Sequence, residues 1–161
     1  MSDVFKKLNL KDQTAIVVLD APASFDTHLA SLGDVRVLRK LPAGRSVAFA
    51  IVFATTLAAV EKVARDVAPR LDGDAILWLA YPKGTSKRYT CEFNRDSGWA
   101  SLGAAGFEPV RQVAIDEDWS ALRFRRVEYI STLRRDPSRA LSERGKTRHW
   151  SGAPPAVSHL A

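Results

Sequence analysis

The residues with the clearest chemical capacity lie in one short polar segment. Residues 81–88, YPKGTSKR, combine three cations, two aliphatic hydroxyls and one glycine. Cationic side chains and free backbone N–H groups together can hold a phosphate or a carboxylate. The second glycine and the Gly-Lys-Ser/Thr order of a Walker loop are missing. We predict a small-anion site formed by Lys83, Ser86, Lys87 and Arg88; the alternative is a solvated basic loop.

Residues 95–97, Arg-Asp-Ser, can extend that site. We expect them at the start of a helix, where free N–H groups attract anions, so that Arg95 joins the anion-binding set. Asp96 or Ser97 also fits the simpler role of a helix N-cap. Both interpretations remain open from the sequence.

Three acids precede Trp119, in the order Asp116, Glu117, Asp118. Clustered carboxylates can bind a cation or raise one another's pKa. No histidine or further acid lies nearby in sequence, so a solvated turn is an equally simple interpretation, and ion pairing with the predicted anion-site cations is a third. We expect Trp119 to cover the end of a sheet, and we predict no metal site.

No set of residues forms a recognisable catalytic nucleophile. Cys91 is the only cysteine, which excludes an intramolecular disulfide and a CxxC zinc site. Lys87 and Arg88 lie close to it in sequence and can favour its thiolate. The three histidines are scattered. We therefore predict no catalytic residue and no bound cofactor.

Residues 131–161 differ in composition from the rest of the chain. They hold six basic and two acidic residues, so four of the six net positive charges lie there. We predict a basic tail, partly disordered and with one short helix. Such a tail can neutralise nucleic-acid phosphates with a strong salt dependence. A tail without any partner is the alternative.

The remaining composition is that of one ordinary soluble domain. Hydrophobic residues make up 46% of the 161, and we place the domain at residues 1–130. The longest apolar run, VAFAIVFA at 47–54, is short against the roughly 20 residues that span a bilayer. The first residues lack the apolar core of a signal peptide. We expect a cytoplasmic protein that does not contact a membrane.

Apolar runs alternate with helical patterns along the domain. This alternation predicts a mostly parallel sheet of about six strands between two helical layers. Short linkage of the last two strands predicts an antiparallel hairpin. Asp72-Gly73-Asp74 is expected to be a turn. We expect strands at 15–19, 35–38, 47–54, 75–81, 110–115 and 120–127. We expect helices at 24–32 (N-cap Ser24), from Thr55 or Thr56 with an apolar stripe to Leu71, and from Asp96 or Ser97 to 105. Pro69 is expected to distort or end the second helix.

This order of elements resembles the sheet of the class I methyltransferases, a Rossmann-like fold. The resemblance is clearest from Asp74 to Glu128, where a strand, a helix ending in AAGF and an edge strand are followed by an antiparallel strand slotted inside the edge. Three segments, 77–87 (LWLAYPKGTSK), 95–99 (RDSGW) and 115–125 (IDEDWSALRFR), are similar to an uncharacterised bacterial family, a domain of unknown function. That family has no established activity, so it implies no catalytic residue.

The cofactor-binding features of a working methyltransferase are missing. One helix and one strand are absent between Leu38 and Val47, and residues 20–24, DAPAS, replace the glycine-rich turn after the first strand. That turn needs glycine's missing Cβ and its freedom at positive φ to approach a cofactor. A working methyltransferase also has an acid at the end of the second strand, which binds the ribose hydroxyls. In this sequence Leu38-Arg39-Lys40 occupies that position.

Three functions therefore compete. We favour a non-catalytic domain that binds a small anion or a protein partner at the carboxyl edge of its sheet. The second is a diverged transferase or nucleotide-binding enzyme that uses Asp20, Tyr81 and Asp96. The third is association with nucleic acid through the basic tail.

Overall fold

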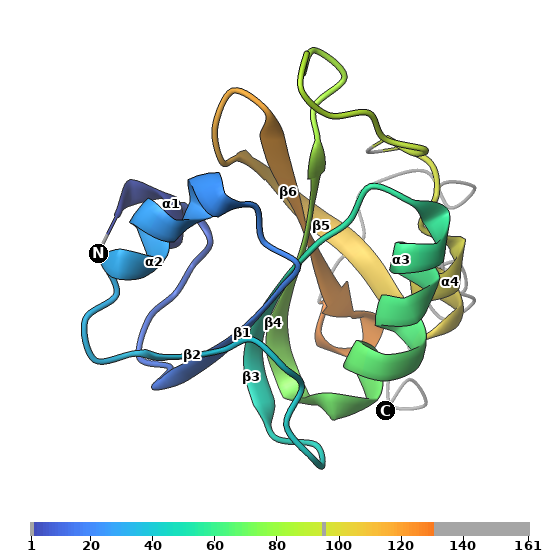
Figure 1. Cartoon of the computed structure of the whole chain (residues 1–161). Coiled ribbons are helices and arrows are strands. Elements are labelled where there is room, and N and C mark those ends of the chain that lie inside the picture. Colours follow the sequence, from blue (N-terminus) through green and yellow to red (C-terminus); the bar gives the residue numbers. More distant parts are fainter. Residues whose placement is uncertain (1, 95, 131–161) are drawn as a thin grey trace.

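A computed structural model of the chain describes residues 2–94 and 96–130, which form a three-layer α/β fold (Figure 1). A six-stranded sheet has the order β2-β1-β3-β4-β6-β5. β2, β1, β3 and β4 are mutually parallel, and β6 is antiparallel to both β4 and β5. The predicted fold class is confirmed. The strands are β1 (Ala15–Leu19), β2 (Arg36–Leu38), β3 (Val47–Phe53), β4 (Leu71–Pro82), β5 (Phe107–Ala114) and β6 (Trp119–Arg126).

Short helices cover both faces of the sheet (Figure 1). One face carries α1 (Asp3–Lys7), the 3₁₀ turn η1 (Ala23–Phe25) and α2 (Asp26–Ala30). The opposite face carries α3 (Leu57–Lys62), the π-helical turn η2 (Val63–Val67), the 3₁₀ turn η3 (Ala68–Arg70) and α4 (Ala100–Ala104). A last 3₁₀ turn, η4 (Val127–Tyr129), follows β6. We call these two sides the α1/α2 face and the α3/α4 face.

The core of the α1/α2 face is largely aromatic. Phe5 of α1 packs against Phe25 and Phe49, with ring centroids 5.6 and 6.5 Å apart. The buried indole N–H of Trp78 donates to the carbonyl of Leu8 at 2.9 Å, which fastens the N-terminal segment to β4. The sequence did not predict α1, because five residues are too few for a helical period to be read.

The α3/α4 face is built on Val60, Val63, Val67, Trp99 and Leu102, all buried. The predicted cap of the first helix is confirmed, since the hydroxyl of Thr56 accepts the N–H of Ala59 at 3.1 Å. The expected distortion at Pro69 is confirmed, because this residue lies in the 3₁₀ turn that ends the helical segment at Arg70, although the α-helical form is lost earlier. The α-helical part ends at Lys62 and widens into η2, and the Pro69 turn leads directly into β4, which Leu71 begins.

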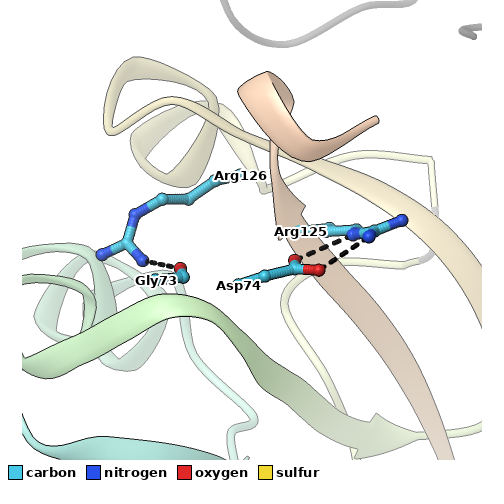
Figure 2. A network of polar contacts seen from close by, with 4 residues as sticks. All are labelled: Gly73, Asp74, Arg125 and Arg126. Atoms are coloured by element: carbon cyan, nitrogen blue, oxygen red, sulfur yellow. Dashed lines mark hydrogen bonds and ion pairs between the residues drawn. The ribbon is translucent and has the colours of Figure 1, made fainter. Parts of the chain in front are cut away.

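The predicted turn at residues 72–74 is also wrong, because these residues belong to β4. Pairing of Leu71 with Val47 extends the strand backwards, and Gly73 takes φ 57° beside an irregularity in the register. Asp74 is held by Arg125 of β6 through two hydrogen bonds of 2.8 and 2.6 Å (Figure 2). Tertiary pairing therefore overrides a local sequence that favours a turn.

Arg126 joins the end of β6 to the start of β4. Its guanidinium donates to the carbonyls of Ala68 and Leu71 at 3.1 and 3.0 Å, and also to the carbonyl of Gly73 (Figure 2). It also lies over the ring of Phe107, 5.2 Å from the centroid. The carbonyl of Ala68 also accepts the N–H of Leu71, so Arg126 adds a second donor there and ties η3 and the start of β4 to the end of β6.

Two helix starts differ from the sequence predictions. Pro22, not Ser24, occupies the N-cap position of η1, and the helical segment ends at Ala30. α4 begins at Ala100 with Trp99 before it, so neither Asp96 nor Ser97 caps it. Gly98, which lies between Ser97 and Trp99, has φ 94°, a conformation that interrupts a helix.

Among residues 2–94 and 96–130, no helix is long and apolar enough to cross a membrane. The predicted basic tail, residues 131–161, lies outside the described residues, as does Arg95.

We predict that Gly98→Ala lowers the free energy of unfolding by about 2–4 kcal/mol, because of strain at positive φ and overpacking. A Cβ at Gly98 would stand 2.5 Å from the Cβ of Phe93 and 3.1 Å from a methyl of Leu57. Gly84→Ala is the matched control, since nothing lies within 4 Å of a Cβ there. Urea unfolding of both variants measures the difference, and equal midpoints would contradict the prediction.

Candidate anion-binding site

The carboxyl ends of β1, β3 and β4 meet at one edge of the sheet, because the three strands are parallel and adjacent. Asp20 follows β1, Ala54 follows β3 and Lys83 follows β4. Open α/β sheets bind ligands at this edge. The loop after β4 and the hairpin turn between β5 and β6 project from it side by side (Figure 1), joined by a 2.7 Å hydrogen bond from the N–H of Lys83 to the carbonyl of Asp118.

The turn after β1 uses an aspartate where the methyltransferase pattern has glycine. Asp20 takes φ 60°, a left-handed conformation that aspartate tolerates better than most residues. The turn therefore attains the backbone shape of a glycine turn at one position while keeping a Cβ. Phe25 then anchors it on Phe53, with ring centroids 4.9 Å apart.

The end of β2 carries a cation where the pattern has an acid. Arg39 forms a surface ion pair with Asp26 of α2 at 3.6 Å. A ribose hydroxyl needs an acceptor, which a guanidinium cannot provide.

Ser86 organises the loop after β4. Its hydroxyl donates to the carboxylate of Asp118 at 2.9 Å and accepts the N–H groups of Arg88 and Tyr89 at 3.3 and 3.2 Å. The N–H of Ser86 itself bonds to the carbonyl of Lys83 at 3.0 Å. The hydroxyl predicted to bind an anion is thus already engaged, and it fixes the shape of the loop.

The cations of this loop have no anionic partner within the described part of the chain. Lys83, Lys87 and Arg88 form no ion pair there, although Asp118 lies against the same loop. The backbone N–H groups of Gly84, Thr85 and Lys87 are also without a partner among the described residues. Three positive charges and three donors are therefore available on a loop whose backbone is already fixed.

Aromatic stacking holds the loop to the sheet. Tyr89 packs on Trp119 at 4.9 Å, and Trp119 packs on Phe53 at 5.2 Å between ring centroids. Trp119 is buried, as expected of a residue that covers the sheet end.

The acidic turn has a structural role. The carboxylate of Asp116 accepts the N–H groups of Asp118 and Trp119, both at 2.8 Å, and Asp118 is bound to Ser86. Only Glu117 of the three acids is exposed. Among the described residues, no group of three or more His, Cys, Asp or Glu side chains is arranged so that it could hold a metal ion. The predicted ion pairs between this turn and the loop lysines do not form, and a hydroxyl contact takes their place.

The segment before α4 is organised by Asn94. Its side-chain oxygen accepts the N–H of Asp96 at 2.8 Å and the hydroxyl of Ser97 at 3.3 Å. This local turn competes successfully with helix capping.

The cations near Cys91 in sequence do not favour its thiolate in the fold. Burial raises the pKa of its thiol, a backbone hydrogen bond with Phe93 opposes the rise, and the carboxylate of Glu92 adds to it. Neither Lys87 nor Arg88 contributes to this balance.

Two hollows lined by described residues lie at the opposite, amino edge of the sheet. One, of about 530 Å³, is lined by residues that include Gln13, Arg36 and Ser46. The other, of about 480 Å³, is lined by residues that include Asp72, Arg123 and Arg125. The sequence interpretation overlooked this edge; the alternation of Arg123 and Arg125 in LRFRR, which places both on one face of a strand, is the signal that could have found it.

Comparisons with known proteins establish the fold and nothing finer. No family model matches this chain, and no curated protein matches it. A SAM-dependent methyltransferase from Aquifex aeolicus superposes with a TM-score of 0.54 at 16% identity, over 78% of this chain and 88% of that one. A possible exported protein from Bordetella parapertussis gives 0.52 at 13% identity, over 77% and 66%. The chain has a methyltransferase-like Rossmann fold.

We predict that Ser86→Ala lowers the free energy of unfolding by about 1–2 kcal/mol, because two backbone N–H groups and one carboxylate lose their partner. Thr85→Ala is the matched control, since Thr85 is exposed and its hydroxyl makes no hydrogen bond within the described residues. Urea unfolding of the two variants tests this, and a Ser86→Ala variant as stable as the control would refute it.

We predict that Cys91 reacts slowly with iodoacetamide at neutral pH, because its raised pKa leaves little thiolate. The midpoint of the rate against pH should lie higher in the folded protein than in the same chain unfolded in urea. A folded midpoint at or below the unfolded one would show that the loop cations do activate this thiol.

Proposed function

We propose that this protein is a non-catalytic domain of methyltransferase-like fold that binds a small anion on the loop after β4. The proposal rests on three cations, Lys83, Lys87 and Arg88, that form no ion pair within residues 2–94 and 96–130. They lie on a loop whose shape Ser86 holds. A pre-shaped loop loses little conformational entropy when a ligand binds. Arg95 is the remaining predicted member of the site.

The position of Asp118 limits where the anion can lie. Its carboxylate accepts from Ser86, so negative charge occupies that side of the loop. An anion is therefore favoured at the free N–H groups of Gly84, Thr85 and Lys87, with the lysine ammonium groups closing over it. Ser86 acts as a positioning residue in this arrangement.

The shape of the turn after β1 supports the proposal that this protein does not transfer methyl groups. Asp20 and Pro22 bring side-chain bulk to the place where a cofactor needs bare backbone. Arg39 offers no acceptor for a ribose. The methyltransferase activity of the Aquifex aeolicus protein belongs to that protein and implies no reaction for this one.

The other expectations from the sequence stay predictions. These are a protein partner at the same edge, a diverged transferase or nucleotide-binding enzyme, nucleic-acid association through residues 131–161, a cytoplasmic location, and membership of the uncharacterised bacterial family.

A site-resolved titration tests the proposal. On addition of inorganic phosphate, we expect saturable changes in the ¹H–¹⁵N amide signals of Gly84, Thr85 and Lys87. The triple variant Lys83→Gln, Lys87→Gln, Arg88→Gln should bind at least tenfold more weakly, since three charged contacts are lost. Calorimetry with S-adenosylmethionine should give no binding heat.

The triple variant Lys40→Gln, Arg45→Gln, Lys62→Gln removes the same charge from exposed sites without ion pairs, and it should bind as the wild type does. Amide signals that do not move with phosphate, or equal weakening in both triple variants, would refute the loop site. Saturable heat with S-adenosylmethionine would refute the absence of a cofactor.

A further inference from the structure

An arginine cluster lies at the amino edge of the sheet, at the other end of β4 from the loop. The open hollow of about 480 Å³ found there is within the size range of small-molecule sites. Its polar lining comes from Asn9, Gln13, Asp72, Asp74, Arg123 and Arg125.

Strand register assembles the cluster. Arg111 of β5 pairs directly with Arg123 of β6, so their side chains lie on the same face of the sheet. Arg125 follows two residues later on that face. Trp78, the partner of Arg123 on β4, places the cluster on the α1/α2 face.

Only one of these arginines has an anionic partner among the described residues. Arg125 holds both carboxylate oxygens of Asp74, at 2.8 and 2.6 Å, with both side chains about two-thirds buried (Figure 2). Asp74, the carboxylate that raises the pKa of the Arg123 guanidinium, is thereby already engaged. Arg111 and Arg123 form no ion pair and no side-chain hydrogen bond within the described part of the chain.

Arg123 is held in an unfavourable state by its surroundings. The side chain is half-buried, and its Nε–H is buried with no acceptor among residues 2–94 and 96–130. Burial lowers the pKa of its guanidinium, Arg125 and Arg111 lower it further, and Asp74 opposes them. Buried donors are almost always paired in folded proteins, so an unpaired one needs a reason. With Arg125 and Arg111 on either side, an oxyanion is the partner best suited to this guanidinium.

We propose that this hollow binds a small oxyanion, a carboxylate or a phosphate, with Arg123 of its lining as the receptor. Arg111, the register partner of Arg123 on the same face, is the adjacent cation. The side-chain oxygen of Gln13 accepts the N–H of Lys11 at 2.8 Å, which leaves its NH₂ group as a further donor. Planar guanidinium groups match carboxylate and phosphate oxygens. Asp72, on the same lining, disfavours ligands of high negative charge such as polyphosphates.

The side-chain Nε–Hε signal of Arg123 in ¹H–¹⁵N spectra reads the site directly. We expect it to shift saturably with sodium phosphate or sodium acetate, and not with sodium chloride at equal ionic strength. A response to phosphate alone, or to acetate alone, assigns the ligand class. No saturable shift with either anion, or an equal shift with chloride, would overturn the proposal.

Thermal stability supplies a second readout, in the Lys83→Gln, Lys87→Gln, Arg88→Gln background so that the loop site cannot contribute. There the bound anion should raise Tm by roughly 3–6 °C for each tenfold rise in concentration above its Kd. Arg123→Met should abolish this rise while keeping Tm without anion close to its original value, since it removes a half-buried guanidinium that has no anionic partner among the described residues.

Arg111→Gln changes an exposed residue and so preserves the fold, and it should weaken binding several-fold. Full anion response in either Arg123→Met or Arg111→Gln would overturn the proposal. If the loop after β4 binds no anion, the Arg123 Nε–Hε signal should still shift on addition of phosphate or acetate. The failure of one proposal can therefore be distinguished from the failure of the other.

Discussion

Burial of β4 on both faces is the constraint on which the rest of this structure depends. From Ala75 to Pro82 every residue is buried, and no charged side chain occurs in that span. Uncompensated charge inside such a strand would cost several kcal/mol. Polar chemistry is therefore confined to the two ends of the strand. One end continues into the Lys83 loop, and the other, beginning at Leu71, carries Asp74 and its partner Arg125.

The strands could be predicted from the sequence because their apolar runs record burial directly. β1 was predicted to the residue, and the hairpin of β5 and β6 was predicted from its short connection. Where pairing partners decide the conformation, prediction failed. Asp72-Gly73-Asp74 has the composition of a turn, yet Leu71 pairs with Val47 and Arg125 binds Asp74, so the segment is strand. The change from α-helix to π-helical turn at Val63 does not alter the helical spacing of apolar residues in the sequence, so it could not be predicted.

Of the candidate site, sequence identified the chemical groups but not their partners. Lys83 and Lys87 could be placed at the end of a central strand from hydropathy alone. The engagement of Ser86 could not, because Asp118 lies 32 residues away and reaches it only when β6 enters the sheet beside β4. The cluster around Arg123 could not be predicted either, because Arg123 lies beside Arg111 only through the register of β5 and β6.

The length of β4 also isolates its two ends from each other. Asp74 and Lys83 are nine positions apart, which at about 3.3 Å per residue is roughly 30 Å of extended chain. The Debye length at physiological ionic strength is about 8 Å. Charge added or lost at one terminus of the strand is therefore screened before it reaches the other. Substitutions at the two edges can accumulate without mutual electrostatic penalty, so each edge is free to diverge on its own.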